Sequence, residues 1–548
     1  MAVMEVGKLN IEPFTLEAVM EIHIKEILND HAVFYLLARL EEDQEDDPIF
    51  DISNETSIKL TSDGTVLFIG VIKNINITCV DSVYYLRVAA VSNTIKIDVE
   101  TKRRSFQDAG MKYRSIVEKI TKSGGSRVTF GDSKAADKTV ENILLQYDET
   151  DWMFSKRLAS HSNAILIPKI DSETPDFIFG VGAGSSKDKL ESYNYSVSKN
   201  LDVYRAMSQF PALGFTENDS VSYTIIANDY VFNLGDMLTL DGNPVYVSAI
   251  NLKLVGSVLK CAYTLSTKAA ISAAKFFNDI IGLHLLGEVL KVENDTVRVR
   301  LDIDESDTVD NGQDDDNSYP FKYSTPYTAE GHTGWYVMPE EGDKLQIIFP
   351  TEDEKEAYAT TAIRQEDTDR TEDPLVKYLR TPFGKEIKFD ENEILISAKD
   401  ETTFIRINED EEEGIEIITP HPIKITSNST ISMESDDDFK ITTHKKLIIT
   451  ADESILMTTN DDNSAFSMES SAPGVVIDSQ DPIKVLGIKT VDISSKEGFT
   501  AKAGKDFSLS SDKKVKISGS SAVEASGGGS SIKMDGNVDI KGKLIKEN

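Results

Sequence analysis

Apolar and polar residues alternate with a period of two over most of the chain, which is typical of strands that bury one face. Seven such runs precede residue 270: Ala18–Ile24, Phe34–Leu40, Thr65–Ile75, Val83–Val91, Ser222–Ile226, Val245–Ile250 and Lys260–Ser266. The density of the first four predicts a small β-barrel or sandwich before residue 100. The pattern therefore indicates a mainly β fold.

Helical spacing interrupts the two groups of strands. A helix is expected over Ser105–Ile120, with Ser105 and Asp108 as a capping pair. Its apolar face would carry Tyr113, Ile116, Val117 and Ile120. A second short helix is expected at Asp151–Ser160, where Arg157 lies in the last turn and suits the negative end of the helix dipole. This segment is therefore predicted to be a small α/β insertion.

Another β unit is predicted at 281–363. Glu288–Val292 leads through Asn294-Asp295 into an alternating run and so predicts a hairpin, and Lys344–Phe349 is a further strand. About five strands in eighty residues fit a small barrel of the OB type. The polar residues 364–386 are expected to be a linker.

From residue 423 onward the apolar residues repeat every eight positions. Each unit holds two apolar residues separated by one residue, usually polar, followed by turn formers such as Ser, Asp, Asn and Gly. Irregular steps between Ile455 and Val475 predict a bulge or loop. The residues expected to be buried are Ile423, Ile425, Ile431, Met433, Phe439, Ile441, Leu447, Ile449, Ile455, Met457, Val491, Ile493, Phe507, Leu509, Val515 and Ile517.

The length of this repeat predicts a trimer. Eight residues hold one strand and one turn, whereas a solenoid made by one chain usually needs about twenty residues or more per coil. Three chains, each giving one strand per level, could close a triangular prism in which each inward side chain stabilises by about 1.5–3 kcal/mol when buried. Residues 387–548 are therefore predicted to be an intertwined trimeric β-helix. The alternative is a β-sandwich of short strands.

Composition narrows the classes of function. The 548 residues carry 58 basic and 93 acidic side chains, a net charge of −35, which argues against nucleic acid or an anionic membrane as a partner. Cys79 and Cys261 are expected to be buried free thiols. No secretory leader and no apolar run of about eighteen residues is visible. We therefore expect synthesis in the cytoplasm, where the chain stays until something else moves it.

Three motifs stand out in the chain: Gln146-Tyr147-Asp148-Glu149-Thr150-Asp151-Trp152 with Arg157, Ser105-Phe106-Gln107-Asp108 with Tyr113, and Met338-Pro339-Glu340-Glu341-Gly342-Asp343-Lys344. These motifs resemble those of the VgrG-type spike proteins and the related hub proteins of phage tails. The order of parts along the whole chain is also similar to that of the family. The resemblance implies structural roles for Gln146, Tyr147, Asp151, Trp152, Arg157, Pro339, Gly342 and Asp343.

The resemblance implies a cell-puncturing spike and central baseplate hub. In that family, segments corresponding to 1–100 and 201–280 are tube-like β-barrels on either side of the insertion at 101–200, so three chains present six barrels to a six-fold tube. Sheath contraction would drive the needle through the target envelope. The implied partners are two further copies of the chain, tube and baseplate proteins, a separate small tip protein and separate effector cargo. Contact with the target-cell envelope would be transient, after release or delivery of the particle.

No catalytic, cofactor or metal site is predicted. The seven histidines show no metal-ligand spacing, and residues 364–386 are too few for the lysozyme domain that some phage relatives carry there. The alternative functions are a trimeric receptor-binding tail fibre or adhesin, and a β-helical enzyme that degrades cell wall or polysaccharide. The residues do not distinguish a phage tail from a bacteriocin, a type VI secretion system or an extracellular injection particle.

Overall fold

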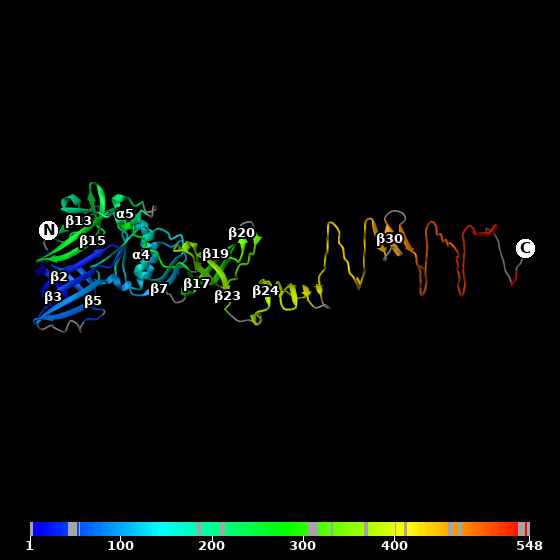
Figure 1. Ribbon diagram of the computed structural model, residues 1–548, viewed down its shortest axis with the longest axis horizontal. Coiled ribbons are helices and arrows are strands. Elements are labelled where there is room, and N and C mark those ends of the chain that lie inside the picture. Colours follow the sequence, from blue (N-terminus) through cyan, green and yellow to red (C-terminus); the bar gives the residue numbers. More distant parts are fainter. Residues whose placement is uncertain are drawn as a thin grey trace. The chain divides into compact units, whose positions relative to one another are not determined.

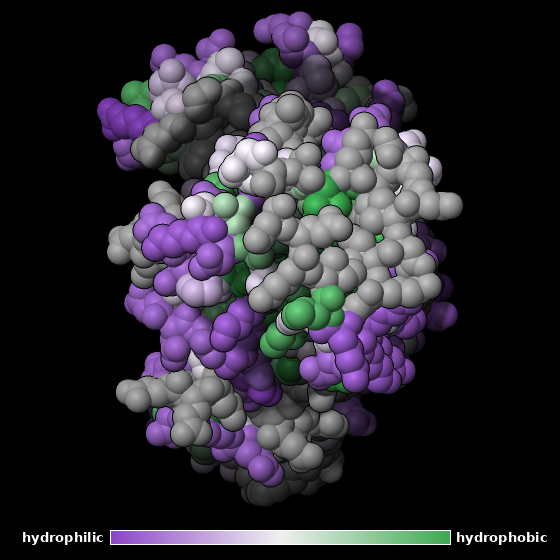
Figure 2. Space-filling view, turned by 90° about the vertical axis from the view of Figure 1, so that its right-hand side faces the viewer, coloured by the Kyte–Doolittle hydropathy of each residue, from purple (hydrophilic) through white to green (hydrophobic). Residues whose placement is uncertain are grey.

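The computed structural model divides the chain into two compact units, Met1–Pro420 and His421–Asn548. The residues that the structure describes are 4–41, 52–53, 55–182, 188–208, 214–228, 230–304, 316–329, 333–365, 371–399, 402–409, 414–458, 464–469, 474–534 and 543–544. Figure 1 shows sheets and short helices in the first unit and a series of extended rungs in the second. Hydrophilic residues cover most of the coloured surface in Figure 2, in keeping with the large net charge.

Eleven of the described strands form one antiparallel sheet in the first unit. Their order is β1 (Leu9–Glu12), β4 (Ser57–Ser62), β5 (Thr65–Val80), β6 (Val83–Ser92), β3 (Val33–Leu40), β2 (Leu16–Ile27), β15 (Asn243–Val255), β16 (Val258–Ser266), β13 (Val221–Ala227) and β12 (Tyr195–Lys199), with β14 (Met237–Leu240) beside β15. Ile24 of β2 lies opposite Leu252 of β15. The two regions predicted as separate barrels are thus the halves of one continuous hydrogen-bonded sheet.

Burial alternates along these strands as the sequence pattern predicts. In β3, the side chains at 34, 36, 38 and 40 are buried and those between them are at least partly exposed. Phe34 stacks on Phe68 of β5, with ring centroids 5.2 Å apart. Both residues share one hydrophobic core with Tyr263 of β16. Because burial of apolar surface is the main favourable contribution to folding, this common core holds the two halves together.

A small insertion lies between the two halves along the chain. Its elements are β7 (Thr101–Phe106), α2 (Tyr113–Lys122), β8 (Val128–Phe130), α3 (Ser133–Ala136), β9 (Leu144–Thr150), α4 (Asp151–His161), β10 (Leu166–Pro168) and β11 (Phe177–Phe179). The predicted second helix is present as α4. The apolar face predicted for α2 is buried against Trp152 and Phe154 of α4, in a core of its own. The other described helices and turns are η1 (Val6–Lys8), η2 (Asn93–Ile97), η3 (Leu190–Ser192), α5 (Leu201–Met207), η5 (Glu217–Ser220), α6 (Lys268–Ser272), η6 (Asp302–Asp304) and η7 (Glu354–Glu356).

Two expectations for the first unit, one for the insertion and one for the large sheet, are wrong. The first helix begins at Tyr113 and not at Ser105, because Ser105 belongs to strand β7. The Asp108 carboxylate accepts a hydrogen bond from the Gly110 backbone N–H (2.8 Å) in the turn that follows, and so it caps no helix. Cys261 is buried as expected, but Cys79 is exposed, because the last residues of β5 extend beyond the core.

Five strands close into a barrel after the insertion. They follow the order β17 (Leu283–Glu293), β18 (Thr296–Leu301), β19 (Pro320–Ser324), β23 (Tyr358–Ile363) and β22 (Lys344–Phe349), with the small pair β20 (Thr328–Ala329) and β21 (Thr333–Gly334) outside it. The predicted hairpin is β17–β18, and the predicted strand at 344–349 is β22. Ile143 and Leu145 of the insertion share the barrel's core with Val299 and Phe321. The insertion and the barrel are therefore packed together.

The first unit ends in a five-stranded antiparallel meander. Its strands are β24 (Lys377–Arg380), β25 (Glu386–Phe389), β26 (Glu393–Ser397), β27 (Phe404–Asn408) and β28 (Ile415–Ile418). Part of the predicted linker 364–386 is therefore strand. The meander also occupies the start of the predicted needle, where the sequence spacing departs from eight.

The second unit turns every eight residues. Bends fall at 428–429, 436–437, 444–445 and 452–453, and again at 488–489, 496–497, 504–505 and 512–513, with extended backbone between them. The irregular steps predicted after Ile455 are a small antiparallel sheet of β29 (Ser454–Thr458), β30 (Ser464–Glu469) and β31 (Val475–Ser479). Near the end, β32 (Val523–Gly527) pairs with β33 (Ser530–Met534).

A substitution at Gly287 tests how closely strands β17 and β18 of the barrel pack. A methyl group at this position of β17 would lie 2.7 Å from the Arg300 carbonyl oxygen of β18, too close for two heavy atoms. We expect Gly287→Ala to lower the free energy of unfolding by about 1–3 kcal/mol. The control is Gly7→Ala, where an added methyl meets nothing within 4 Å. Denaturant unfolding of both variants checks the prediction, and equal stability would contradict it.

Candidate functional site

The motif that starts at Gln146 ends β9 and begins α4. The Thr150 hydroxyl accepts a hydrogen bond from the Met153 backbone N–H (3.1 Å), which caps the helix at its N-terminus. Most of α4 is buried, including its polar residues Asp151, Ser155 and Arg157. Because buried charged groups cost free energy when they lack partners, Asp151 and Arg157 need bonds inside the protein, whereas the Ser155 hydroxyl has no hydrogen-bond partner among the described residues.

Arg157 lies at the centre of a buried ionic network. Its Nη2 donates to Glu149 Oε2 (2.8 Å) and to the Leu145 carbonyl oxygen (2.6 Å), and its Nε donates to Glu149 Oε1 (3.0 Å). Its Nη1 donates to Glu354 Oε1 of η7, beside the five-stranded barrel (2.7 Å). Arg157 is only 1% exposed. The guanidinium therefore joins α4 and β9 of the insertion to the barrel.

A second buried guanidinium orders the rest of the motif. The Arg104 Nε of β7 donates to Gln146 Oε1 (2.8 Å), and Arg104 also forms an ion pair with Asp151. The Gln146 amide in turn donates to the Glu149 carbonyl oxygen (2.9 Å) and to Asp151 Oδ1 (3.2 Å). These bonds fix β7, β9 and the first turn of α4 relative to one another.

The protonation of the Arg157 network follows from its charges. Burial raises the pKa of Glu149 above its usual value, because the attraction of Arg157 only partly offsets the loss of water and Glu354 adds repulsion. For Arg157 itself, burial disfavours the charged form, but Glu354 and Glu149 outweigh burial and raise its pKa. The guanidinium is therefore charged, with two carboxyl groups around it.

Trp152 connects the same helix to the first half of the large sheet. Its ring lies against the His31 ring, with centroids 4.7 Å apart, and meets Phe177 edge to face at 5.5 Å. His31 Nε2 lies 2.9 Å from Asp98 Oδ2, and the Thr150 hydroxyl donates to the same carboxylate. Burial alone would raise the pKa of Asp98, but the hydrogen bonds from His31 and Thr150 outweigh burial and lower it. The start of α4 is thus bonded to the sheet, and its later turn to the barrel.

Three further bonds join the insertion to the barrel. The Ser105 backbone N–H and hydroxyl donate to the two oxygens of Asp304 (2.7 and 2.8 Å). The Gln107 amide donates to the Val299 carbonyl oxygen of β18 (3.0 Å). Ser105 and Gln107 belong to the second sequence motif. This motif was expected to begin a helix, and instead it joins the insertion to the barrel.

The structure brings together only some of the predicted motif residues. Gln146, Asp151, Trp152 and Arg157 lie in the buried region, whereas Tyr147 lies under the Arg103 guanidinium, 4.7 Å from ring centroid to Cζ. The other predicted residues, Pro339, Gly342 and Asp343, occupy a turn before β22. There Gly342 has φ +91°, and the Gly342 and Asp343 backbones bond to Val289 of β17 (both 2.9 Å). This turn closes one end of the barrel and is separate from the network.

Sequence reasoning missed several partners of the motif. Glu354 and Asp304 lie almost 200 positions away from the residues that they bind, so no local spacing indicates them. His31 carries no signal either, because a single histidine in a turn is ordinary. Arg104 stands directly before the second motif, in the part of β7 that is buried. A basic residue at such a position is a signal that the sequence reasoning could have used.

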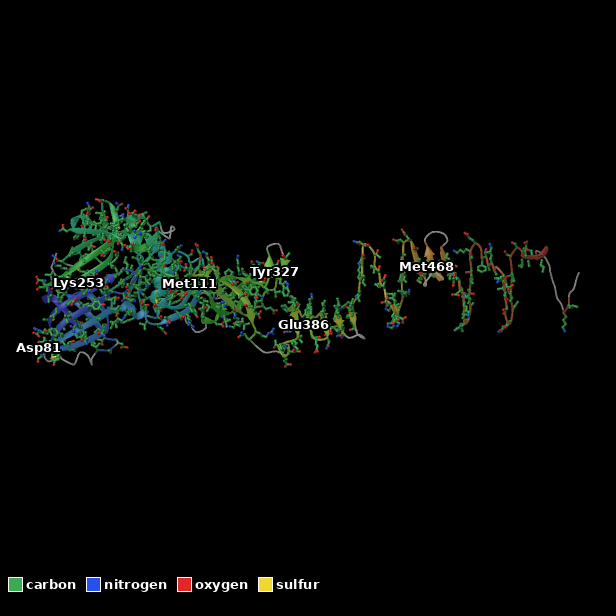
Figure 3. All side chains as sticks on the ribbon, viewed as in Figure 1. Asp81, Met111, Lys253, Tyr327, Glu386 and Met468 are labelled. Carbon is green, nitrogen blue, oxygen red and sulfur yellow. The ribbon has the colours of Figure 1, made fainter. Side chains whose placement is uncertain are left out.

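The predicted core of the eight-residue repeat is uncovered in the single chain. Fifteen of the sixteen residues are between 46% and 71% exposed, and Ile455 is partly buried on β29. No strand pairing within the chain joins the described rungs 422–451 and 482–519. Figure 3 shows their side chains on single rungs of backbone, with Met468 labelled on β30. These rungs leave both apolar side chains and backbone hydrogen-bonding groups without covering chain.

The meander has one apolar and one charged face. Cross-strand pairs place Leu379 beside Ile387, Ile387 beside Ile396, and Ile396 beside Ile405. The apolar face consists of Leu379, Ile387, Phe389, Ile394, Ile396, Ile405, Ile407, Ile415 and Ile417, and all but the partly buried Ile387 are exposed. On the other face, Arg406 bonds to Glu393 (2.7 Å) and Glu416 (2.9 Å). An exposed apolar face of this size is typical of an interaction surface.

The described residues hold neither a metal-binding cluster nor a membrane-spanning helix. Among the described residues, no three His, Cys, Asp or Glu side chains lie close enough together to hold a metal ion. In the same ranges, every helix is too short or too polar to span a lipid bilayer.

Solved structures similar to this chain include a type VI secretion component, a VgrG complex and phage tail proteins. The E. coli c3393 protein, a component of the type VI secretion system, is 12% identical, with a TM-score of 0.45 over 65% of this chain and 100% of that chain. In the half-lidded Francisella PdpA–VgrG complex, the matched chain is 9% identical, with a TM-score of 0.46 over 75% and 87%. The 43 kDa tail protein of the Shewanella oneidensis prophage MuSo2 is 9% identical, with a TM-score of 0.38 over 48% and 97%. No protein-family model and no curated protein matches the sequence.

The buried network predicts unequal effects of two substitutions. Arg157→Met leaves Glu149 and Glu354 without a positive partner, and we expect it to lower the free energy of unfolding by about 3–5 kcal/mol at neutral pH. Glu354→Gln keeps an acceptor for Arg157 and leaves Glu149 as its counter-ion, so a loss of about 1 kcal/mol is expected. Urea unfolding of both variants measures the difference.

The pH dependence provides the control. Without the attraction of Arg157, burial would hold the folded-state pKa of Glu149 further above its usual value, so the stability of Arg157→Met is retained at low pH and lost as pH rises. Arg157→Met should therefore recover much of its stability between pH 8 and pH 5, and Glu354→Gln should not. Equal losses and parallel pH profiles would show that Arg157 contributes by packing alone.

Proposed function

We propose that the chain is a structural spike and hub of a contractile injection machine and that it works as a homotrimer. The observation that carries this proposal is the uncovered row of apolar side chains along the eight-residue rungs. A protein that is stable in water does not leave such a row exposed. The rungs are also too short to fold over themselves, so the covering surface has to come from other chains.

Two further copies fit the repeat better than an unrelated partner. Each rung presents two apolar residues on one side, as Ile423 and Ile425 do, and the next rung repeats them after eight positions. Three identical strands at one level would turn these residues inward and pair their free backbone groups with neighbouring rungs. The result is an intertwined β-helix with a triangular section and a polar exterior.

The meander supports the same assembly. Its last apolar pair, Ile415 and Ile417, precedes Ile423 and Ile425 by the same eight residues. The apolar row thus begins before the rungs, and the charged face with Arg406 satisfies itself through ion pairs. We infer that three meanders pack their apolar faces together ahead of the needle.

The first unit is proposed to connect this three-fold needle to a six-fold tube. We assign the halves of the large sheet, near 1–100 and 201–280, to two tube-like units on either side of the insertion at 101–200, so that a trimer presents six of them. The five-stranded barrel at 281–363 is assigned to the OB class. The ionic network around Arg157 and the shared core at Leu145 support a role in passing axial force from the sheet through the insertion to the barrel.

The proposed action requires no reaction by this chain. Contraction of a sheath would supply the free energy, and the needle would resist buckling while it opens the target envelope. Tube and baseplate proteins, a small tip protein and separate cargo are the partners proposed from the family resemblance. The chain would be made in the cytoplasm and act as part of an assembled phage-tail-like particle.

A single pair of substitutions tests the trimer. Ile441 points to the proposed interior, and Lys440 next to it is exposed and bonds to Asp438 (2.9 Å). Ile441→Asp would place three carboxylates at one level of the core, so we expect the trimer to weaken or dissociate. Lys440→Asp changes the charge more but leaves the core intact, and it should remain trimeric.

Light scattering of the full chain measures the solution mass of each variant and so its oligomeric state. The expected mass of the unchanged protein and of Lys440→Asp is three times 60.6 kDa. A monomeric unchanged protein with intact β structure would overturn the trimer and the spike with it. A trimer that tolerates Ile441→Asp would move the interface away from the repeat. Release of sugars from purified cell wall would instead favour the enzymatic alternative.

A further inference from the structure

A carboxyl group occupies a core position of the large sheet. Along β2, Ile22, Ile24 and Glu26 alternate on the inward side, and Glu26 is only 2% exposed. Strand alternation would place an apolar residue there. Burying a carboxylate is costly unless it is paired, and Glu26 has no cation beside it among the groups that shift its titration. The residue therefore requires a physical explanation.

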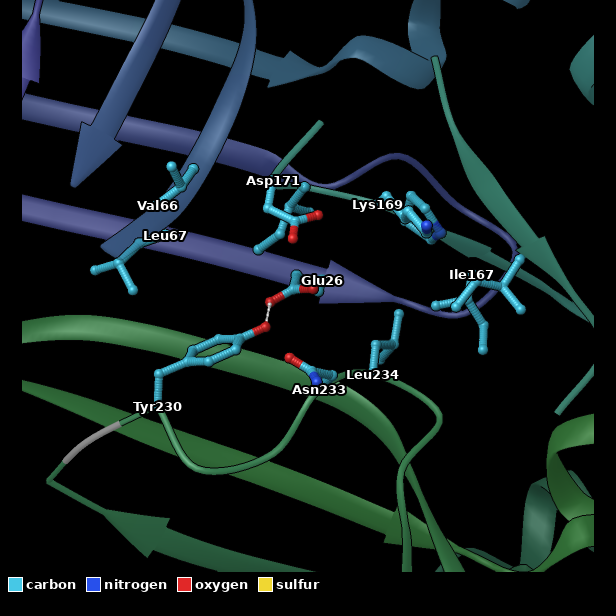
Figure 4. Close-up of a pocket in the computed structure, with 12 residues that line it drawn as sticks. Glu26, Val66, Leu67, Ile167, Lys169, Asp171, Tyr230, Asn233 and Leu234 are labelled. Carbon is cyan, nitrogen blue, oxygen red and sulfur yellow. Dashed lines mark hydrogen bonds between the residues drawn. The ribbon is translucent and has the colours of Figure 1, made fainter. Parts of the chain in front are cut away.

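Glu26 lines a cavity of about 200 Å³ where three segments meet. Figure 4 shows Val66 and Leu67 of β5 on one side, Tyr230 and Leu234 on another, and Lys169 with Asp171 on the third. The Tyr230 hydroxyl donates a hydrogen bond to Glu26 Oε1 (2.9 Å). The segments come from the first half of the sheet, from the loop before β14 and from the insertion. The cavity is large enough for more than one water molecule.

The walls of the cavity are held by backbone contacts. The Ile69 N–H of β5 donates to the Ile170 carbonyl oxygen of the insertion (2.6 Å). Gly235 of the loop, with φ +83°, packs directly on the Ile167 side chain, and its N–H donates to the Val247 carbonyl oxygen (2.8 Å). Loosening of this cavity would therefore alter how loop 230–236 and segment 166–171 lie on the sheet.

The charged and titratable groups around Glu26 are few. The insertion contributes Asp171, which repels a charge on Glu26, and Lys169, which lines the cavity but is not among the groups that shift the Glu26 pKa. The loop contributes Tyr230, and β5 contributes only apolar side chains. On the neighbouring strand β15, the residue opposite Glu26 is Ile250. Burial raises the pKa of Glu26 to about 7, with Asp171 adding to this and the Tyr230 hydrogen bond opposing it.

We propose that Glu26 is a proton-dependent latch at the junction of the two half-sheets and the insertion. In its neutral form the carboxyl group accepts the Tyr230 hydrogen bond and lies without charge in the cavity. In its ionised form the charge faces Asp171 and needs water, so the cavity hydrates and the walls that Gly235 and Ile170 form are loosened. The latch is independent of the assignment of the chain as a spike.

The direction of the effect follows from linkage. The folded-state pKa of Glu26 is about 7 and its ordinary value is 4.5, so the folded state binds the proton more tightly than the unfolded state. The stabilising contribution is full below the ordinary value, falls as pH rises towards 7 and is absent above it. Over that window the equilibrium for opening the junction should shift by about two orders of magnitude, since each pKa unit is worth a factor of ten.

Thermal unfolding and backbone hydrogen exchange from pH 4.5 to 8.5 test the latch. Exchange is compared with that of Glu26→Gln at each pH, which removes the intrinsic pH dependence of exchange. Glu26→Gln keeps an acceptor for Tyr230 and cannot ionise. Relative to it, the unchanged protein should lose thermal stability as pH rises and should exchange faster in 230–236 and 166–171. The matched control is Asp81→Asn in an exposed turn, which should follow the unchanged protein.

Two variants that retain Glu26 make the test independent of any folding defect. Tyr230→Phe removes the hydrogen bond that lowers the Glu26 pKa, so the midpoint of the transition should move to higher pH. Asp171→Asn removes the repulsion that raises it, so the midpoint should move to lower pH. Opposite movements support the latch. Parallel profiles of the unchanged protein and Glu26→Gln, or midpoints that do not move, would overturn it.

Discussion

One strand cannot cover its own apolar side, and this constraint governs the whole second unit. A rung of about six extended residues also leaves its backbone donors and acceptors to be satisfied by neighbours. A repeat of twenty residues would let one chain turn back and cover itself, whereas a repeat of eight requires other chains. Identical chains are the simplest source, because every level then presents the same two apolar residues to the same axis. The proposed three-fold assembly and its polar exterior both rest on the repeat length.

The sequence predicted features that depend on local spacing. The alternation at Phe34–Leu40, the hairpin around Asn294 and helix α4 are all present, because each is determined by residues within a few positions. The predicted start of α2 was wrong, because Ser105 belongs to β7, where it pairs with Leu145 and bonds to Asp304. The single continuous sheet was also missed. Pairing of β2 with β15 joins residues more than 200 positions apart, which no local pattern reveals.

The motif residues show how a sequence signature can be structural. Gln146, Asp151 and Arg157 were expected to have structural roles, and each is buried and bonded to a neighbour. A buried ion pair contributes little net stability compared with apolar packing, but it admits only a narrow range of geometries. In the proposed role of passing force along an axis, a fixed angle between insertion and barrel would matter more than the free energy gained. This reasoning explains why the charges lie at the junction and not in the centres of the two cores.

Two of the buried acidic sites of the first unit differ in their partners. Glu149 and Glu354 share the guanidinium of Arg157, which remains charged across the physiological range, so the junction between insertion and barrel keeps a fixed positive charge. Among the described residues, Glu26 receives a hydrogen bond from the neutral Tyr230 hydroxyl and is repelled by Asp171, so we propose that its junction responds to pH. The insertion thus meets the barrel at a side chain with a permanent charge, and it meets the sheet at one whose charge is proposed to change. A change of pH would then alter the fit of the insertion on the sheet, while Arg157 keeps its charge at the contact with the barrel.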